Sequence, residues 1–518
     1  DPARQKIVHH ARLAIGVLRR VGVTLRGVVG DTALVSYLLD PSRHPPHHLE
    51  QIARAVLRRA VQPLKGVVGS GKDFRRFDQL PPARAGAYAC HLAEVCGAAW
   101  YAMEPELARV GLDRLYQDVD LPLSETLARM EEVGIRVDPV RLATLERSFE
   151  KEKARVAEDI HTLAGRPFNI GSLKQLGVVL FEELKLPVLK KTKTGYSTDS
   201  ETFEKLRSKH PIIEQILRWR TLAKLIDTYT TVLTRAIDPA DGRVHTTFQQ
   251  TVAVSGRLIT TEPDLQRTPV RTGEFRQIRE AFVAAPGWRL VSADWSQIEL
   301  RLLAHVSSDQ RLLEAFRTGT DVHRATAAEL FDVPPQLVTR EQRDVGKTVN
   351  FATVYGQGAT ALGQNLRISR SKAKEYIDRF FACYDGVAAW KQQVVTDAYL
   401  HGYTATLLGR RRYIPELKSN NFTDRAYGER IATNAPIQGS AADLCKMAML
   451  RIDRDLAGMQ ARLVLQVHDE LVIECPPEEV DRAVGIARKH MEEVGKAVGL
   501  TVPLAVDVGV GETWADAH

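Results

Sequence analysis

The sequence has few cysteines and no long apolar run, and each of these absences narrows the class of protein. Five cysteines occur in 518 residues, without a C-x-x-C pair or a cysteine and histidine spacing typical of zinc. A disulfide framework is therefore not expected, and the thiols are interpreted as reduced, in a cytoplasmic setting. No stretch has the length of a membrane span, and the first residues lack an apolar signal core. We expect a soluble protein that no membrane holds.

The sequence contains no internal repeat and no low-complexity tract. It also lacks an initiator methionine, so we expect a trimmed chain whose start lies upstream. What the chain does have is length and basic charge. Its 71 Lys and Arg residues exceed its 64 Asp and Glu residues, which gives a net charge of +7. The length predicts several domains, and the charge suits a polyanion such as nucleic acid without requiring one.

The pattern of residues changes along the chain. Residues 1 to about 115 mix short apolar runs with helical patterns, and residues 120–235 read as long amphipathic helices. Strand-like segments then return on both sides of a helical stretch at about 310–400. This order predicts one sheet with a helical subdomain built into it, and an α+β fold class.

Two carboxylates stand at the ends of predicted strands. LVSA leads to Asp294 just before a predicted helix, and LVLQVHDELVIEC places Asp469 at the tip of a predicted hairpin. Carboxylates at neighbouring strand ends could hold two divalent cations, as in-line phosphoryl transfer requires. Such ions would compensate the charge at the join of two apolar strands.

Each acidic motif also has a purely structural interpretation. Ser296 and Glu299 fit an S-x-x-E capping box, which is as good an account of Glu299 as a functional one. Taken alone, the segment His468–Glu470 is better explained as a polar hairpin turn.

A third segment, TREQRDVGKTVNFATVYGQG, shifts this balance. Thr339 and Gln342 can cap a helix that the following glycines end. Four-residue steps place two cations and two aromatic rings on one broad face, which suits a nucleoside triphosphate. These residues are Arg343, Lys347, Phe351 and Tyr355. The alternative, a solvated basic edge beside a core aromatic stripe, is weakened by the two acidic strand ends.

In this order, DWSQIELR, RDVGKTVNFATVYG and QVHDE resemble motifs of the family A DNA polymerases, of the bacterial DNA polymerase I type, in their large-fragment portion. The likeness runs from about residue 120 to the end and includes TVAVSGRLITTEPDLQ, TNAPIQGSAAD and VDVGVGETWADAH. It implies a right-hand fold with an antiparallel-sheet palm, preceded by an α/β exonuclease-like domain. The implied domains are a partial exonuclease-like domain (1–115), a helical thumb (116–240), the first part of the palm (241–320), helical fingers (321–420) and the second part of the palm (421–518).

The resemblance implies an enzyme that adds dNTPs to a primer 3′-OH on a DNA template with two Mg²⁺ ions, for which Mn²⁺ can substitute. It assigns the metal to Asp294, Asp469 and the carbonyl of Trp295, with Glu470 close by as a further catalytic carboxylate. It assigns the triphosphate to Arg343, Lys347 and His323, with Lys347 as proton donor to pyrophosphate. It assigns the nucleotide sugar and base to Gln297, Glu299, Phe351 and Tyr355, and the primer-template to Arg257, Gln266, Arg271, Gln438 and His468.

The resemblance also implies specificity and context. Phe351 implies discrimination against dideoxynucleotides, and Glu299 would block a ribose 2′-OH. The basic loop KKTKTG would grip phosphates, although a solvated turn explains it equally well. The partners expected are primer-template DNA and dNTPs, for a monomer at the bacterial nucleoid that fills gaps in repair and replication. The rival hypotheses are a catalytically silent primer-template scaffold and a single-subunit RNA polymerase of the same fold.

Some residues depart from the family pattern. Asp264 and Arg267 stand where Asn is common in the family, and Trp295 stands where Tyr is usual. GVVGSGKD, residues 66–73, fits part of a phosphate loop, but Asp73 replaces the required Ser or Thr. We interpret this segment as a chance match.

The first 115 residues resemble the later part of a 3′–5′ exonuclease domain. GDTALVSYLL keeps Asp31 at a metal-binding position, and YACHLA keeps Tyr88. Leu92, however, stands where a second metal-binding Asp belongs, and a leucine cannot ligate Mg²⁺.

We therefore predict that the chain has no proofreading activity. Single-stranded DNA incubated with the purified chain and Mg²⁺ should stay at full length, as followed by gel electrophoresis. Shortening that depends on the metal and disappears in Asp31→Ala would contradict the prediction.

Overall fold

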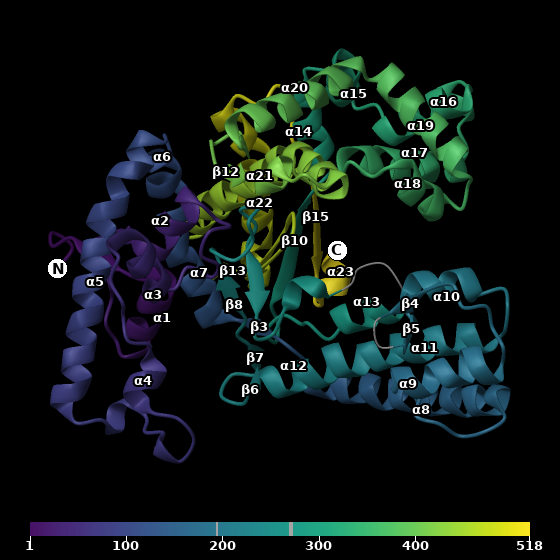
Figure 1. Cartoon of the computed structure of the whole chain (residues 1–518). Coiled ribbons are helices and arrows are strands. Elements are labelled where there is room, and N and C mark those ends of the chain that lie inside the picture. The colour runs from purple at the N-terminus through teal and green to yellow at the C-terminus, as the bar shows by residue number, and fades with distance from the viewer. Residues whose placement is uncertain (193–194, 269–272) are drawn as a thin grey trace.

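The structure, a computed structural model, describes residues 1–192, 195–268 and 273–518 (Figure 1). Helices account for most of the elements, and the sheet with the most strands is antiparallel. The predicted α+β class is therefore confirmed. The hydrophobic core is continuous from Leu123 to Ala517, whereas the apolar side chains before residue 120 form smaller clusters of their own, one of which runs from Leu34 to Val119.

A four-stranded antiparallel sheet lies in the middle of the molecule, in the order β13, β14, β10, β15 (Figure 1). Its strands span Arg462–Val467, Glu470–Cys475, Arg289–Trp295 and Val506–Gly511. Every residue of β14 is buried, and helix α22 (Val480–Glu493) packs on β10, β14 and β15. Since β10 precedes the helical insertion and β13 follows it, one sheet does span the insertion, as predicted. The strand-like segment at 243–249, however, belongs to separate small sheets, so the prediction of a single sheet is wrong for that segment.

The insertion between β10 and β13 is almost entirely helical. A short hairpin, Tyr403–Ala405 paired with Arg411–Tyr413, is β11 and β12. The helices α14 to α21 are Ile298–Ser307, Gln310–Thr318, Val322–Phe331, Arg340–Val354, Ala359–Leu366, Arg370–Cys383, Asp385–His401 and Phe422–Asp455. Figure 1 shows α15 to α19 together on one side of the sheet.

A second helical region precedes the sheet. Its longest helix, α8, begins where the Asp138 side chain accepts from the amides of Val140 and Arg141, and it ends at Gly165, whose φ of 75° a glycine adopts without strain. The helices of this region, α7 to α13, are Leu121–Val133, Pro139–Ala164, Leu173–Gly177, Ser200–Leu206, Ile212–Lys224, Thr231–Ala236 and Gly273–Arg279.

Short strand pairs complete the region around these helices. Strand β3 (Ile135–Arg136) pairs with β7 (Arg243–Val244), which pairs with β6 (Ile237–Asp238). The other pairs are β8 (Thr247–Gln249) with β9 (Ile259–Thr261), and β4 (Lys191–Thr192) with β5 (Gly195–Tyr196). Part of the predicted KKTKTG loop, Lys193 and Thr194, lies outside the described residues.

The N-terminal region contains a β-α-β unit. Strand β1 (Lys6–Val8) pairs in parallel with β2 (Val28–Asp31) across helix α1 (Ala11–Arg20). The remaining helices α2 to α6 are Thr32–Leu39, Leu49–Ile52, Leu64–Val68, Pro82–Arg109 and Asp113–Leu115, followed by a π-helical turn, Tyr116–Asp120. The phosphate-loop match starts within α4, with no strand directly before it, as a chance match should.

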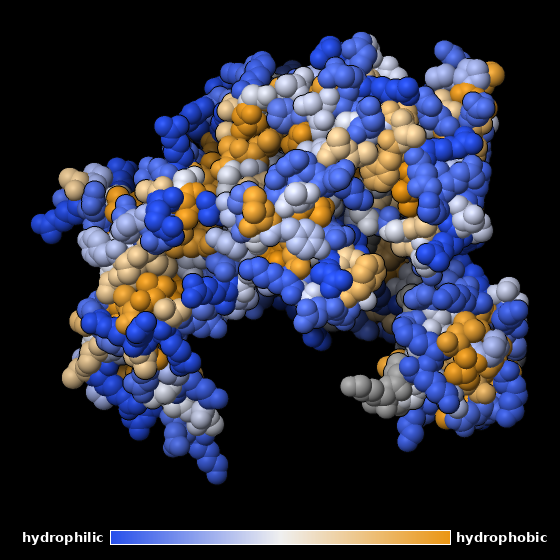
Figure 2. Space-filling view, turned by 45° about the horizontal axis from the view of Figure 1, so that its top comes forward, coloured by the Kyte–Doolittle hydropathy of each residue, from blue (hydrophilic) through white to orange (hydrophobic). Residues whose placement is uncertain are grey.

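The surface in Figure 2 shows hydrophobic side chains in separate patches among hydrophilic ones. Among the described residues, none of the helices combines the length and apolar character that crossing a bilayer requires.

The N-terminal region buries histidines in a neutral state. Burial lowers the pKa of His9 to about 3 and that of His47 to about 4. Their Nδ1 atoms lie 2.8 Å from Thr32 Oγ1 and 2.9 Å from Ser36 Oγ.

We predict that this region unfolds first in mild acid. Below pH 6.5 the unfolded chain protonates these histidines while the folded chain does not, so folding weakens until the pH reaches the folded pKa values, by about 1.4 kcal/mol per pH unit for each ring. Hydrogen exchange between pH 7 and 5 should show protection falling more in residues 1–120 than in β10 and β14. A variant with His9→Gln and His47→Gln should show a shallower pH dependence. An equal loss of protection in both regions would contradict the prediction.

Candidate active site

The site begins where three strands meet. Strands β13 and β14 are joined by a two-residue turn, His468 and Asp469, in which His468 has a φ of 54°. In the register of the sheet, Asp294 on β10 pairs with Glu470 on β14. The amide of Trp295 donates to the carbonyl of Asp469 at 3.4 Å. The sheet therefore brings Asp294 and Asp469 together across 175 positions of sequence, although no motif links them locally.

The ionised forms of these two carboxylates are destabilised by their surroundings. Burial, followed by the charges of Asp469 and Glu470, raises the pKa of Asp294 to about 7. Burial also raises the pKa of Asp469. Asp294 Oδ1 is buried and has no hydrogen-bond partner among the described residues. A divalent cation fits this donor set, because it would supply both the missing partner and the missing positive charge.

Glu470 differs from its two neighbours because donors surround its carboxylate. Burial opposes its ionisation, but His518, Arg279, Ser292 and Trp514 together lower its pKa. Ser292 Oγ and Trp514 Nε1 donate to Oε1 at 2.6 and 2.5 Å, and Arg279 donates to Oε2 at 3.4 Å. Glu470 thus anchors the turn to the strand and to the C-terminal helix α23 (Trp514–Ala517). Sequence reasoning missed these partners, which lie far from Glu470 in sequence.

Helix α17 presents the predicted basic and aromatic face. The Thr339 and Gln342 capping box forms, which confirms the predicted start of the helix. The Phe351 and Tyr355 rings stack, with centroids 6.3 Å apart and an interplanar angle of 18°. Arg343 Nε donates to Asp321 at 2.5 Å, whereas Lys347 forms no hydrogen bond or ion pair with any residue that the structure describes. One cation of the predicted pair is held, and the other is available to a ligand.

Helix α17 lies directly against α16. A Cβ at Gly346 would lie 2.4 Å from the carbonyl oxygen of His323, so only glycine permits this approach. His323 is buried, and burial lowers its pKa to about 4, so the ring is neutral. Its Nδ1 lies 3.0 Å from Asn350 Nδ2. Asn350 therefore fixes the ring beside Phe351.

Glu299 connects the aromatic face to the loop before the sheet. Arg257 donates to one carboxylate oxygen at 2.8 Å, and the Tyr355 hydroxyl donates to the other at 2.6 Å. Helix α14 begins at Ile298, with Gln297 before it at a φ of 57° and no side-chain cap. The capping-box interpretation of Ser296 and Glu299 is therefore wrong, because the left-handed residue shifts the start of the helix.

Arg257, Glu299, Tyr355 and Asp469 line one cavity of about 310 Å³. Two residues predicted to contact DNA, Gln266 and His468, line it as well. The rest of the lining consists of Leu258, Ile298, Ala441, Ala442, Cys445, Lys446 and Gln466. Asp294 lines a neighbouring depression with Ser292, Arg488, Asp507 and His518, among others.

The other predicted residues are placed as follows. Trp295 is buried and donates from Nε1 to the carbonyl of Met491 at 2.8 Å, and Gln297 has a buried Oε1 without a partner in the described part of the chain. Gln266 donates to Gln466 Oε1 at 2.9 Å. Gln438 is half-buried on α21 and does not line the cavity. Arg271 lies outside the described residues.

The two departures from the family pattern at 264 and 267 contact each other. Arg267 Nε lies 2.9 Å from Asp264 Oδ2, and Thr260 donates to Asp264 Oδ1 at 3.0 Å. The two side chains therefore satisfy one another without DNA.

The carboxylate of Asp31 is occupied by backbone amides. It accepts from His10, Ala11, Ala33 and Leu34, at 2.6 to 3.4 Å. It caps helix α2 and fixes the start of α1, so its lone pairs already have partners. Leu92 packs against an apolar cluster instead of entering a polar site.

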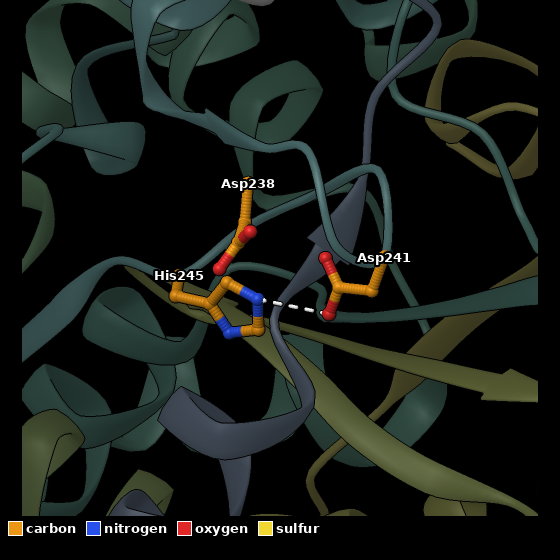
Figure 3. A group of neighbouring side chains, drawn as sticks. All are labelled: Asp238, Asp241 and His245. Carbon is orange, nitrogen blue, oxygen red and sulfur yellow. Dashed lines mark hydrogen bonds and ion pairs between the residues drawn. The ribbon is translucent and has the colours of Figure 1, made fainter.

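Outside this site, Asp238, Asp241 and His245 gather at the turn between β6 and β7 (Figure 3). Both ring nitrogens of His245 are engaged, Nδ1 with the carbonyl of Glu131 at 2.7 Å and Nε2 with Asp241 at 3.1 Å. We assign this exposed group no function.

Comparison with known proteins decides the family. Residues 140–516 match DNA polymerase family A. The chain belongs to the family A DNA polymerases. It is similar to DNA polymerase I of Geobacillus stearothermophilus, with 44% identity over the whole chain and 59% of that protein. It is similar to DNA polymerase I of Pseudomonas aeruginosa, with 41% identity over the whole chain and 57% of that protein. The chain thus spans less than two thirds of these relatives.

A solved structure is also similar to this family A chain. It is the POL domain of Pol1 from M. smegmatis in complex with DNA primer-template and dNTP. The two chains share 40% identity with a TM-score of 0.91, over 100% of this chain and 87% of the other.

We predict that Asp294→Asn stabilises the metal-free protein. Because the pKa of Asp294 is raised, its carboxylate weakens folding at any pH above its ordinary value, and fully above pH 7. At pH 8 with a chelator, the variant should melt about 1–3 °C higher than the wild type. Added Mg²⁺ should raise the wild-type melting temperature and should affect the variant less.

Asp159→Asn, at an exposed position inside α8 and away from both helix ends, is the matched control and should melt like the wild type with or without Mg²⁺. A lower melting temperature for Asp294→Asn without metal would show that its charge is compensated within the protein.

Proposed function

We propose that this family A chain adds deoxynucleotides to a primer 3′-OH on a DNA template. The observation that carries the proposal is the pair Asp294 and Asp469 at neighbouring strand ends: burial raises the pKa of both, and Asp294 Oδ1 has no hydrogen-bond partner among the described residues. Its relatives are DNA polymerases I, and the similar M. smegmatis domain holds DNA primer-template and dNTP. These relatives support the same chemistry here.

Asp294 and Asp469 would hold two Mg²⁺ ions, with the Trp295 carbonyl contributing and Mn²⁺ as a substitute. Bound there, the ions would supply activation of the primer hydroxyl and stabilisation of the pyrophosphate charge. Glu470 holds the turn that carries Asp469 and keeps both oxygens on its own donors. We infer that it orients the site.

The triphosphate would bind along α17. Lys347 has no partner among the described residues and meets the phosphates as a point charge, and it donates a proton to the departing pyrophosphate. Arg343 would exchange Asp321 for the triphosphate, because both are anions that compete for one guanidinium. Neutral His323 supplies a further hydrogen bond.

The nucleoside would lie against Phe351, with Tyr355 at the position of the template base until the nucleotide pairs there. Glu299, fixed by Arg257 and Tyr355, would leave no room for a ribose 2′-OH. Gln297 lies at the same helix start. Arg257, Gln266, Gln438 and His468 would contact the primer-template near its terminus, and Arg271 is assigned the same role.

The proposed domains follow the elements described above. Residues 116–240 form the thumb, 241–320 and 421–518 the palm, and 321–420 the fingers. Residues 1–115 form an exonuclease-like domain without nuclease activity, because the Asp31 carboxylate accepts hydrogen bonds from backbone amides and Leu92 packs against an apolar cluster. The setting proposed is a monomer in the bacterial cytoplasm, at the nucleoid, in gap filling during repair and replication.

Primer extension tests this function. With Mg²⁺, dNTPs and a short primer-template, the wild type should copy the template, and Asp469→Ala should lose about 10³-fold or more in rate, since the loss of one metal ligand removes several kcal/mol of transition-state stabilisation. Asp481→Ala should keep the wild-type rate. Gel-resolved extension products give the measurement.

Two results would replace the proposal. Duplex binding without any extension would make the chain a scaffold, and equal use of rNTPs and dNTPs would make it an RNA polymerase of the same fold.

A further inference from the structure

The turn that precedes Arg257 is held from three sides. In the turn, the amide of Gly256 donates to the carbonyl of Ala253 at 3.1 Å. The next residue, Arg257, enters the cavity and donates to Glu299. Contacts that hold this turn in place therefore also position the Arg257 guanidinium, which faces the proposed primer terminus.

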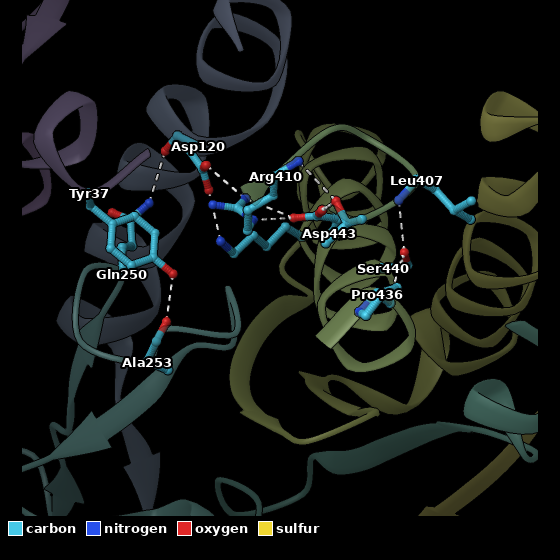
Figure 4. A network of polar contacts seen from close by, with 11 residues as sticks. Tyr37, Asp120, Gln250, Ala253, Leu407, Arg410, Pro436, Ser440 and Asp443 are labelled. Atoms are coloured by element: carbon cyan, nitrogen blue, oxygen red, sulfur yellow. Dashed lines mark hydrogen bonds and ion pairs between the residues drawn. The ribbon is translucent and has the colours of Figure 1, made fainter. Parts of the chain in front are cut away.

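The first side is the N-terminal region. The Tyr37 hydroxyl of helix α2 donates to the carbonyl of Ala253 at 2.6 Å (Figure 4). Tyr37 is 1% exposed, and its ring belongs to the core cluster that runs from Leu34 to Val119. A ring packed in one region thus places its hydroxyl on the backbone of another, 216 residues away.

The second side is a buried cluster of four charges. Arg410 donates to Asp120 at 2.8 Å and to Asp443 at 2.8 Å, and Lys446 donates to Asp120 at 2.8 Å. All four side chains are at most 4% exposed, and their charges sum to zero. Figure 4 shows Asp120, Arg410 and Asp443 joined in this cluster. A buried cluster of this kind is rigid, because moving one member would leave another charge unpaired.

This cluster touches the turn directly. A Cβ at Gly256, whose φ is 87°, would lie 2.8 Å from Arg410 Cδ. The third side is α21, where a Cβ at Gly439 would lie 3.0 Å from the carbonyl oxygen of Ser255. Lys446, a member of the cluster, lines the same cavity as Arg257 and Asp469.

We propose that Tyr37 is a positioning residue for DNA synthesis. Its hydroxyl fixes the turn 253–256, and through the turn it fixes Arg257 at the primer terminus. The exonuclease-like region then serves the polymerase site as a support. This inference rests on the proposed function, and it assigns the N-terminal region a role that needs no nuclease chemistry.

The test uses a substitution that removes only the hydroxyl. Tyr37→Phe keeps the buried ring, so the core should stay intact and the melting temperature should fall by no more than about 2 °C, the cost of one buried hydrogen bond. Single-turnover incorporation on a matched primer-template should slow by about threefold to tenfold, the change expected when one positioning hydrogen bond is lost. The slowing should persist at saturating dNTP, because a higher nucleotide concentration cannot restore the position of the Arg257 guanidinium at the proposed primer terminus.

A double-mutant cycle separates positioning from general support. In an Arg257→Ala background, Tyr37→Phe should have no further effect, because its contribution passes through Arg257. Tyr101→Phe, at a position 72% exposed on α5 in the same region, is the matched control and should behave as wild type.

A wild-type rate for Tyr37→Phe, or a slowing that persists undiminished with Arg257→Ala, would overturn the inference and leave the proposed function standing. No templated extension by the wild type would overturn both. If Tyr37→Phe does not fold, the variant Gly256→Ala is the second test of the inference. Its added Cβ would clash with Arg410 and displace the turn. It should slow the wild type and not the Arg257→Ala variant, and any other result overturns the inference.

Discussion

The burial of two neighbouring carboxylates, Asp294 and Asp469, is the constraint on which the rest of the site depends. Two carboxylates do not approach one another in a buried place unless covalent and hydrogen-bonded structure forces them to. Here the force comes from antiparallel pairing, with β14 buried along its whole length between β13 and β10. The free energy of the sheet offsets the cost of burying the two carboxylates at the strand ends, and this cost would fall if a cation bound there.

Two other groups of buried charges are balanced. Arg243 pairs at 2.7 Å with Glu474 of β14, and the cluster around Arg410 is neutral as a whole. Glu470, next in sequence to Asp469, is surrounded by donors. Adjacent residues of one motif therefore have opposite electrostatic environments. The contrast between Glu470, whose oxygens accept hydrogen bonds, and Asp469, whose pKa burial raises, is not visible in the motif itself.

Local features were predictable from sequence, and tertiary ones were not. The capping box at Thr339, the helix starting after Asp138 and the hairpin at His468 depend on residues within a few positions of each other. The hydrogen bonds of Glu470, and the one between Tyr37 and Ala253, join segments that are distant in sequence. The periodicity of apolar residues along the chain does not predict such contacts. The capping box expected at Ser296 failed for a backbone reason, since Gln297 adopts a left-handed conformation that the sequence pattern does not reveal.

The contact at Gly346 sets the kinematics of the helical insertion. With α17 lying against the backbone of α16 at this point, neither helix can slide or rotate past the other without a collision between main chains. The two helices therefore move as one rigid body. Any movement that brings Lys347 and Phe351 nearer to the sheet carries His323 with it, so these three side chains change position together.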